Sequence, residues 1–210
     1  MIIPKLHYIS QGKTAAEHLE NIRKACAEGI ELVQLRLKNY DETTILNVAR
    51  IAREITSSYQ TKLIINDYFK VAATIKADGV HLGKTDTCPD IAREYLEDWQ
   101  IIGGTANTLD DCNSLINKKI NYIGLGPFQF TTTKDNLSPV LGSQGYRVIC
   151  QSLNSPIPII AIGGITLNDV PSILETGVYG IAVSGEITKN FNNVSKLREL
   201  LTDSGLMEKI

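Results

Sequence analysis

Short apolar runs rich in β-branched residues alternate along the whole chain with longer stretches of helical periodicity. Runs of this length, bounded by turn-forming or polar residues, are typical of buried strands. We expect eight such strands, at residues 6–10, 31–36, 62–67, 79–83, 100–106, 122–127, 157–165 and 180–184. A regular alternation of this kind predicts strands separated by helices from one end of the chain to the other.

The segments between the expected strands carry the periodicity of amphipathic helices. Apolar residues recur at helical spacing in Ala15–Ala27 (Leu19, Ile22, Ala25 and Cys26) and in 44–55 (Ile45, Val48, Ile51, Ala52 and Ile55). Residues with capping oxygens lie near several expected helix starts, namely Asp41, Asp90, Asn168 and Asn193. These positions predict where the helices begin.

Eight strands, each followed by a helix, predict a (β/α)8 TIM barrel that occupies residues 1–210 as a single domain. The alternative is an open doubly wound sheet, which would use fewer strands at this length. No linker or low-complexity tract interrupts the series. The longest segment without periodicity, residues 128–142, is expected to be a loop, and a loop this long in a compact domain is usually functional.

Composition and charge argue against several classes of function. The chain has 210 residues, 43% hydrophobic and 21% charged, with a net charge of −2 and scattered Lys and Arg, so we expect no nucleic-acid partner. No apolar run approaches the roughly 20 residues of a membrane helix, and no signal peptide is evident, which favours a cytoplasmic protein. The four cysteines are far apart, as expected of free thiols in a reducing compartment.

Polar residues interrupt the apolar strands almost entirely at their carboxyl ends, where active sites of this fold lie. Gln34, Arg36 and Lys38 alternate at the end of the second strand, so their side chains share one side. The other interruptions are Asn66, Asp67, His81, Asp86, Thr105, Asn107, Gly163, Gly164, Ser184 and Gly185, with Thr131, Thr133 and Lys134 in the long loop. The sequence therefore predicts one functional rim.

Each of these residues also has a simpler interpretation. Arg36 and Lys38 could form a solvated strand end, although cations that point into a barrel mouth require an anion. His81 could be a hydrogen-bonded core histidine, and Gly163 and Gly164 could only turn the chain. The same glycines would let backbone N–H groups approach a phosphate, and barrels often bind phosphate after the seventh and eighth strands.

Asp67 and Asp86 follow neighbouring strands, and each could either cap the helix after it or bind a cation. Adjacent strands lie about 4.8 Å apart, so two carboxylates at their ends repel unless a cation or a proton lies between them. Oxygen ligands favour Mg²⁺, which proteins commonly bind together with substrate phosphates. One anion site would then combine this metal with Arg36, Lys38 and Lys134.

A second anion site would combine Thr131, Thr133, Gly163, Gly164 and the turn after the eighth strand. Two such sites on one rim imply two phosphorylated substrates, or one substrate with phosphates at both ends. A metal beside basic residues suits a diphosphate leaving group.

The motifs QLRLK (34–38), IIND (64–67), GVHLGKTD (79–86), GLGPFQFTTTK (124–134) and AIGGI (161–165) together resemble the thiamine phosphate synthase family over residues 5–187. The resemblance implies a transferase of thiamine biosynthesis that joins 4-amino-2-methyl-5-(diphosphooxymethyl)pyrimidine to a thiazole phosphate and releases pyrophosphate. Gln34, Arg36, Lys38 and Asn66 would hold the pyrimidine diphosphate, and Asp67 and Asp86 would hold Mg²⁺. Thr105 and Lys134 would contact phosphates, and Thr131, Thr133, Gly163 and the strand-eight turn would hold the thiazole phosphate.

The chain departs from the family pattern at three places. Phe130 replaces a proline, Ser184 comes one residue early, and Asn107 follows the fifth strand where S-x-H is common. These changes leave two alternatives: a TenI-like thiazole tautomerase, which tends to carry a histidine at the position of Asn107, or a non-catalytic thiamine- or thiazole-phosphate-binding protein. The sequence leaves open homo-oligomer formation and whether the thiazole carries a carboxylate.

Overall fold

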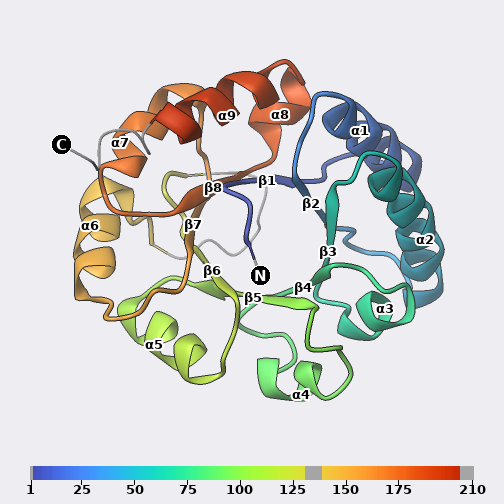
Figure 1. The fold of residues 1–210 in the computed structure, drawn as a ribbon, viewed down its shortest axis with the longest axis horizontal. Helices are drawn as coiled ribbons and strands as arrows, with labels where there is room; N and C mark the ends of the chain where they lie inside the picture. The colour runs from blue at the N-terminus through green and yellow to red at the C-terminus, as the bar shows by residue number, and fades with distance from the viewer. Residues whose placement is uncertain (1, 131–138, 204–210) are drawn as a thin grey trace.

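The computed structural model describes residues 2–130 and 139–203, and its strands form a closed parallel barrel in the order β1 to β8 (Figure 1). The strands are β1 (Leu6–Ile9), β2 (Leu32–Leu35), β3 (Lys62–Asn66), β4 (Gly79–Leu82), β5 (Ile101–Ala106), β6 (Tyr122–Leu125), β7 (Ile159–Ile162) and β8 (Gly180–Val183). Each lies inside one of the eight expected runs. The predicted barrel is confirmed and the open sheet is wrong, since β1 pairs with β8.

Helices surround this barrel on the outside (Figure 1). They are α1 (Ala15–Ala27), α2 (Glu42–Ser58), α3 (Phe69–Thr74), α4 (Pro89–Arg93), α5 (Leu109–Asn117), α6 (Gly142–Ser152), α7 (Val170–Leu174), α8 (Gly185–Lys189) and α9 (Asn193–Asp203), with a short 3-10 helix, η1 (Leu167–Asp169). The first expected helix has the bounds of α1, and the second lies within α2. None of the helices among the described residues is both long and apolar enough to span a membrane.

The expected capping residues all lie at helix starts, but only one of them caps its helix. The Asp41 side chain accepts a hydrogen bond from Thr44 N at 2.9 Å and begins α2. Cys88 and Thr166 precede α4 and η1 instead, so Asp90 and Asn168 lie inside those elements. Asn193 is the first residue of α9, and its amide donates to the carbonyl of Glu186 at 3.0 Å.

Side chains on the two faces of the strands form two apolar layers. Inside the barrel, Ile9, Leu32, Ile64, Ile101, Tyr122, Ile160 and Ala182 form one cluster. Outside it, a larger cluster of residues from the strands and helices fills the space between barrel and helices. The barrel interior is therefore a packed core, which leaves only its ends for a site.

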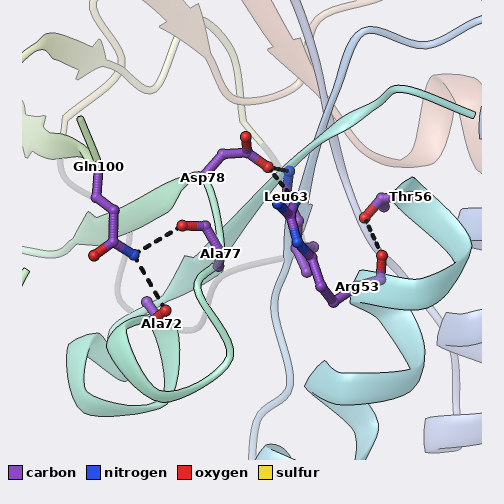
Figure 2. A network of polar contacts seen from close by, with 7 residues as sticks. All are labelled: Arg53, Thr56, Leu63, Ala72, Ala77, Asp78 and Gln100. Carbon is purple, nitrogen blue, oxygen red and sulfur yellow. Dashed lines mark hydrogen bonds and ion pairs between the residues drawn. The ribbon is translucent and has the colours of Figure 1, made fainter. Parts of the chain in front are cut away.

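Polar contacts, partly or fully buried, tie the amino ends of β3, β4 and β5 to the outer helices (Figure 2). Asp78, just before β4, accepts hydrogen bonds from Arg53 of α2 at 2.5 Å and from Leu63 N at 2.8 Å. Gln100, just before β5, donates to the carbonyls of Ala77 at 2.8 Å and Ala72 at 3.2 Å. These contacts lie at the end of the barrel that serves stability rather than catalysis.

Candidate active site at the carboxyl ends of the strands

A cavity of about 1200 Å³ opens at the carboxyl ends of the strands. All the described residues that the sequence predicts for the site line this cavity: Gln34, Arg36, Lys38, Asn66, Asp67, His81, Asp86, Thr105, Gly163, Gly164, Ser184 and Gly185. Thr131, Thr133 and Lys134 lie outside the described residues, as does part of the expected loop at 128–142. The single rim expected from the sequence is thus present for every residue that can be placed.

Two buried amides line the cavity at the ends of β2 and β3. Gln34 Nε2 donates a hydrogen bond to Asn66 Oδ1 at 2.7 Å, and both side chains are buried. The bond fixes the orientation of each amide, because a buried amide that rotated would lose its partner. Both residues line the cavity, so this bonded pair forms part of its wall.

The cationic residues Arg36 and Lys38 follow the last residue of β2 and line the same cavity. The end of β1 braces this segment, because Arg36 N donates to Ser10 Oγ at 3.1 Å. Ser10 Oγ lies 2.8 Å from His18 Nδ1 of α1. The backbone that carries both cations is therefore anchored to its neighbouring strand and helix.

Neither Asp67 nor Asp86 caps a helix, so the capping interpretation is wrong for both. The residues that precede α3 and α4 are Tyr68 and Cys88, and neither of these helices has a side-chain cap. Asp67 has a left-handed backbone, with φ of 65°, which is uncommon for a residue other than glycine. Asp86 Oδ2 accepts a hydrogen bond from Gly83 N at 2.6 Å, which holds its carboxylate near the end of β4.

Burial and the adjacent Asp86 carboxyl raise the pKa of Asp67 to about 7. Arg36 and Lys38 act in the opposite direction, and they do not offset the first two causes. Two carboxyl groups that share a half-buried position require a proton or a cation between them. The repulsion expected from the sequence is therefore present in the folded chain.

The acid pair has the donor chemistry of a site for a hard divalent cation. Across residues 2–130 and 139–203, no cluster of three or more His, Cys, Asp or Glu side chains could enclose a metal. Two carboxylates alone leave most positions of an octahedral ion to water or substrate oxygens, which is how Mg²⁺ usually binds beside phosphates. The residues present fit Mg²⁺ better than a metal enclosed by protein ligands.

His81 lies between two hydroxyl groups. Its Nδ1 is 2.9 Å from Tyr122 Oη, and its Nε2 is 2.9 Å from Thr105 Oγ1. The ring is buried and stacks on Tyr122, with ring centroids 5.5 Å apart. The simpler interpretation of a hydrogen-bonded core histidine fits these contacts.

The turns after β7 and β8 face the acid pair across the cavity. Gly163 and Gly164 have φ values of 99° and 72°, and a Cβ at Gly163 would lie 2.7 Å from Pro127 Cβ. Gly163 O accepts from Gln129 N at 2.9 Å, so this turn supports the start of the long loop. Ser184 precedes the short helix α8, and its Oγ donates to Gln11 Oε1 at 3.4 Å.

Polar residues at strand ends make up only part of the cavity wall. Gln11 and Lys13, between β1 and α1, and Glu17, in the first turn of α1, line the cavity, as do Lys84, Glu186 and Lys189. Gln11 comes just after β1, so the polar end of the first strand marks it in the sequence. The charged residues lie in loops and helices, where no strand periodicity marks them.

Asn107, the residue that separates the two enzyme alternatives, has a structural contact of its own. Its side-chain amide donates to the carbonyl of Gly126, and its backbone N–H donates to Asp111 Oδ2 at 2.9 Å. Unlike imidazole, the amide of asparagine has no basic nitrogen that could accept a proton. The position does not supply the histidine chemistry of the tautomerase pattern.

Comparisons with known proteins agree with this site. A family model described as thiamine monophosphate synthase matches residues 6–187. Thiamine-phosphate synthase of Flavobacterium psychrophilum is 47% identical over 199 residues, covering 93% of this chain and 97% of the relative. The corresponding protein of Bacteroides fragilis is 40% identical over 199 residues, covering 93% and 98%.

The fold also has a close counterpart among solved structures. Thiamine phosphate pyrophosphorylase from Pyrococcus furiosus superposes with a TM-score of 0.82 at 29% identity, covering 95% of this chain and 96% of that one. A family match across the whole barrel, with relatives of this identity, shows that the chain belongs to the thiamine monophosphate synthase family.

Proposed function

We propose that the chain couples 4-amino-2-methyl-5-(diphosphooxymethyl)pyrimidine to a thiazole phosphate, giving thiamine phosphate and pyrophosphate. The observation that carries this proposal is one cavity in which Arg36 and Lys38 lie beside the Asp67–Asp86 pair. The acid pair requires a cation, and Mg²⁺ can supply it. Mg²⁺ together with the side-chain cations suits the binding of a diphosphate. The family to which the chain belongs supports the same substrates.

The residues divide between the two substrates. Gln34 and Asn66 hold the pyrimidine end of the first substrate, and Arg36, Lys38, Thr105 and Lys134 bind its diphosphate. Thr131, Thr133, Gly163, Gly164, Ser184 and Gly185 hold the thiazole phosphate. The short helix α8, after β8, supports this assignment, since barrels commonly bind phosphate at such a helix.

The bond between the pyrimidine methylene carbon and the diphosphate oxygen breaks, and its electron pair leaves with pyrophosphate. The aminopyrimidine ring delocalises the positive charge that develops on the methylene carbon, so a dissociative path is favoured. The lone pair of the thiazole nitrogen then forms the new carbon–nitrogen bond. The nucleophile belongs to the substrate, and the chain needs none of its own.

The protein contributes charge and position. Arg36 and Lys38 stabilise the negative charge that develops on the leaving group. Mg²⁺ held by Asp67 and Asp86 would neutralise further charge on the same group. The turns after β7 and β8 hold the thiazole phosphate so that its ring nitrogen approaches the methylene carbon in line.

The reaction products test this function against its alternatives. The chain with both substrates and Mg²⁺ should form thiamine phosphate, detected by mass spectrometry. Isomerisation of a thiazole phosphate without coupling would instead establish the tautomerase. Binding of either substrate without any turnover would establish the non-catalytic protein.

The metal assignment has its own test. Asp67→Ala and Asp86→Ala should each lower the coupling rate at least tenfold, about 1.4 kcal/mol or more of transition-state stabilisation. Asp90→Ala, which removes an exposed carboxylate in α4, should leave the rate unchanged and serves as the control. Wild-type rates in the Asp67 and Asp86 variants at all Mg²⁺ concentrations would show that the assignment is wrong.

A further inference from the structure

A chain of hydrogen-bonding groups runs from the barrel core to the cavity. It consists of the Tyr122 hydroxyl, the two ring nitrogens of His81 and the Thr105 hydroxyl, joined by two contacts of 2.9 Å. Tyr122 is 1% exposed and lies at the base of β6, whereas Thr105 is half-buried and lines the cavity. The site residue Thr105 is therefore connected to a core residue that does not reach the cavity.

The strand register places these hydrogen-bonding groups at one level of the barrel. His81 of β4 pairs with Gly103 of β5, and Gly103 pairs with Tyr122 of β6. A Cβ at Gly103 would lie 2.1 Å from the Tyr122 ring, so the missing side chain lets the phenol reach His81 across β5. A Cβ at Gly124 would lie 3.0 Å from His81 Cε1, so the absence of a side chain there makes room for the imidazole ring.

Burial of Tyr122 decides the direction of the hydrogen bonds. Among the described residues, His81 Nδ1 is the one hydrogen-bond partner of the Tyr122 hydroxyl. If Nδ1 carried a proton, it would donate to the phenol oxygen, and the phenol proton would be buried without an acceptor. Such an unsatisfied group costs about 1–3 kcal/mol. The phenol therefore donates to Nδ1, and the His81 proton resides on Nε2.

The direction of the second hydrogen bond follows from the first. The Nε2–H group of His81 can only donate, so Thr105 Oγ1 accepts from it. The Thr105 hydroxyl proton then does not point at the imidazole and can be donated to an acceptor in the cavity. An imidazolium would donate from both nitrogens and would again leave the phenol proton without an acceptor.

We propose that Tyr122 is a positioning residue: by fixing His81 as the Nε2–H tautomer, it directs the Thr105 hydroxyl proton into the cavity, towards an oxygen of the substrate diphosphate. The proposal rests on the proposed function for the identity of that acceptor. It assigns a role in substrate recognition to a residue buried below the cavity. It also gives His81 a defined task, which is to transmit the orientation from the core to Thr105.

A double-mutant cycle tests whether Tyr122 acts through Thr105. Tyr122→Phe keeps the ring in its place over Gly103 and removes only the hydroxyl. We expect it to lower kcat/KM for the pyrimidine diphosphate about tenfold, and to leave KM for the thiazole phosphate within about twofold. Thr105→Val should cause a similar loss, Thr105→Ser should retain activity, and Tyr122→Phe should add less than about twofold to Thr105→Val.

The matched control is Tyr146→Phe, which removes the hydroxyl of another fully buried tyrosine. That hydroxyl donates to the Leu125 carbonyl and accepts a longer hydrogen bond from Ile162 N at 3.3 Å, and among the described residues its hydrogen bonds do not involve His81 or Thr105. Its kinetic constants should remain those of the wild type. Equal losses from Tyr122→Phe in the wild-type and Thr105→Val backgrounds, or no loss in either, would overturn the proposal.

A measurement of the tautomer separates this proposal from the proposed function. Nitrogen-15 NMR of the histidine rings should show His81 protonated at Nε2 and bare at Nδ1 in the wild-type chain, with His81→Gln used to assign its signals among the three histidines. A proton on Nδ1 would overturn the proposal whether or not the chain is active. Absence of coupling by a wild-type chain with the expected tautomer would instead overturn the proposed function.

Discussion

The carboxyl group of Asp67 shows how one residue depends on the rest of the site. Its pKa is raised to about 7 by burial and by Asp86, so the folded chain retains a proton that the unfolded chain releases at a much lower pH. Stability from this proton is complete below the ordinary pKa of 3.8 and is lost as the pH rises through about 7. Without a metal, the folded chain is therefore destabilised at alkaline pH.

Asp67→Asn should remove this loss, because asparagine resembles the protonated acid. With chelator present, the variant should melt a few degrees higher than the wild type at about pH 8, and the difference should shrink at about pH 5. Thermal unfolding followed by circular dichroism measures both values. A difference between variant and wild type that does not change with pH would contradict the assigned cause.

At the residue scale, sequence predicts the members of the site better than their contacts. Arg36 and Asp86 could be found because polar residues after apolar strands meet at one end of a barrel. The partners of His81 could not, since Tyr122 and Thr105 are 41 and 24 residues away and only the strand register brings them together. The helix-cap interpretation of Asp67 failed because Tyr68 occupies the position before α3.

Among the turns, the one after β7 combines two requirements for glycine. Gly163 has a positive φ, and a Cβ there would lie 2.7 Å from Pro127, whereas Gly142 also has a positive φ but nothing within 4 Å of such a Cβ. Gly163→Ala should therefore raise KM for the thiazole phosphate at least fivefold, because the displaced loop lies beside its phosphate site. Gly142→Ala should show only the backbone cost, about 1–2 kcal/mol, with unchanged KM.

Steady-state kinetics and thermal unfolding of the two alanine variants separate these effects. Equal changes of KM in both variants would mean that the approach of Gly163 to Pro127 does not shape the thiazole phosphate site. Equal losses of stability in the two variants, without equal changes of KM, would agree with the positive φ that both glycines share.

The contacts at the opposite end of the barrel should affect stability and not catalysis. Gln100→Ala leaves the carbonyls of Ala72 and Ala77 without their side-chain donor in a buried position (Figure 2). We expect a loss of about 2–3 kcal/mol in the free energy of unfolding and an unchanged kcat well below the melting temperature. Denaturant unfolding measures the loss, and Gln151→Ala, an exposed glutamine of α6, provides the control.

A tenfold fall in kcat for a folded Gln100→Ala protein would show that the two ends of the barrel are coupled. Stability equal to that of Gln151→Ala would show that water replaces the lost donor.

At the scale of the whole molecule, the barrel could be predicted from sequence because its rules are local and repeated. Eight apolar runs separated by helical periodicity leave few arrangements, and closure follows when the last strand pairs with the first. The bounds of the single domain, 1–210, stay a prediction, as does a cytoplasmic location, and homo-oligomer formation stays open. None of these follows from the order of the strands.

The extent of the cavity was less predictable, because loops rather than strands supply part of its wall. Lys84 and Lys189 reach it from segments in which neither periodicity nor a strand end marks a functional residue. The central chemical claim nevertheless concerns the whole cavity: both substrates must bind in it together, with the cations beside the diphosphate.

The most direct test of that claim is the stoichiometry of products from the wild-type chain supplied with both substrates and Mg²⁺. Thiamine phosphate and pyrophosphate, quantified in the same samples by mass spectrometry and phosphorus-31 NMR, should appear in equal amounts and only when the thiazole phosphate is present. Pyrophosphate released at the same rate without the thiazole phosphate, or no thiamine phosphate at all, would contradict the account.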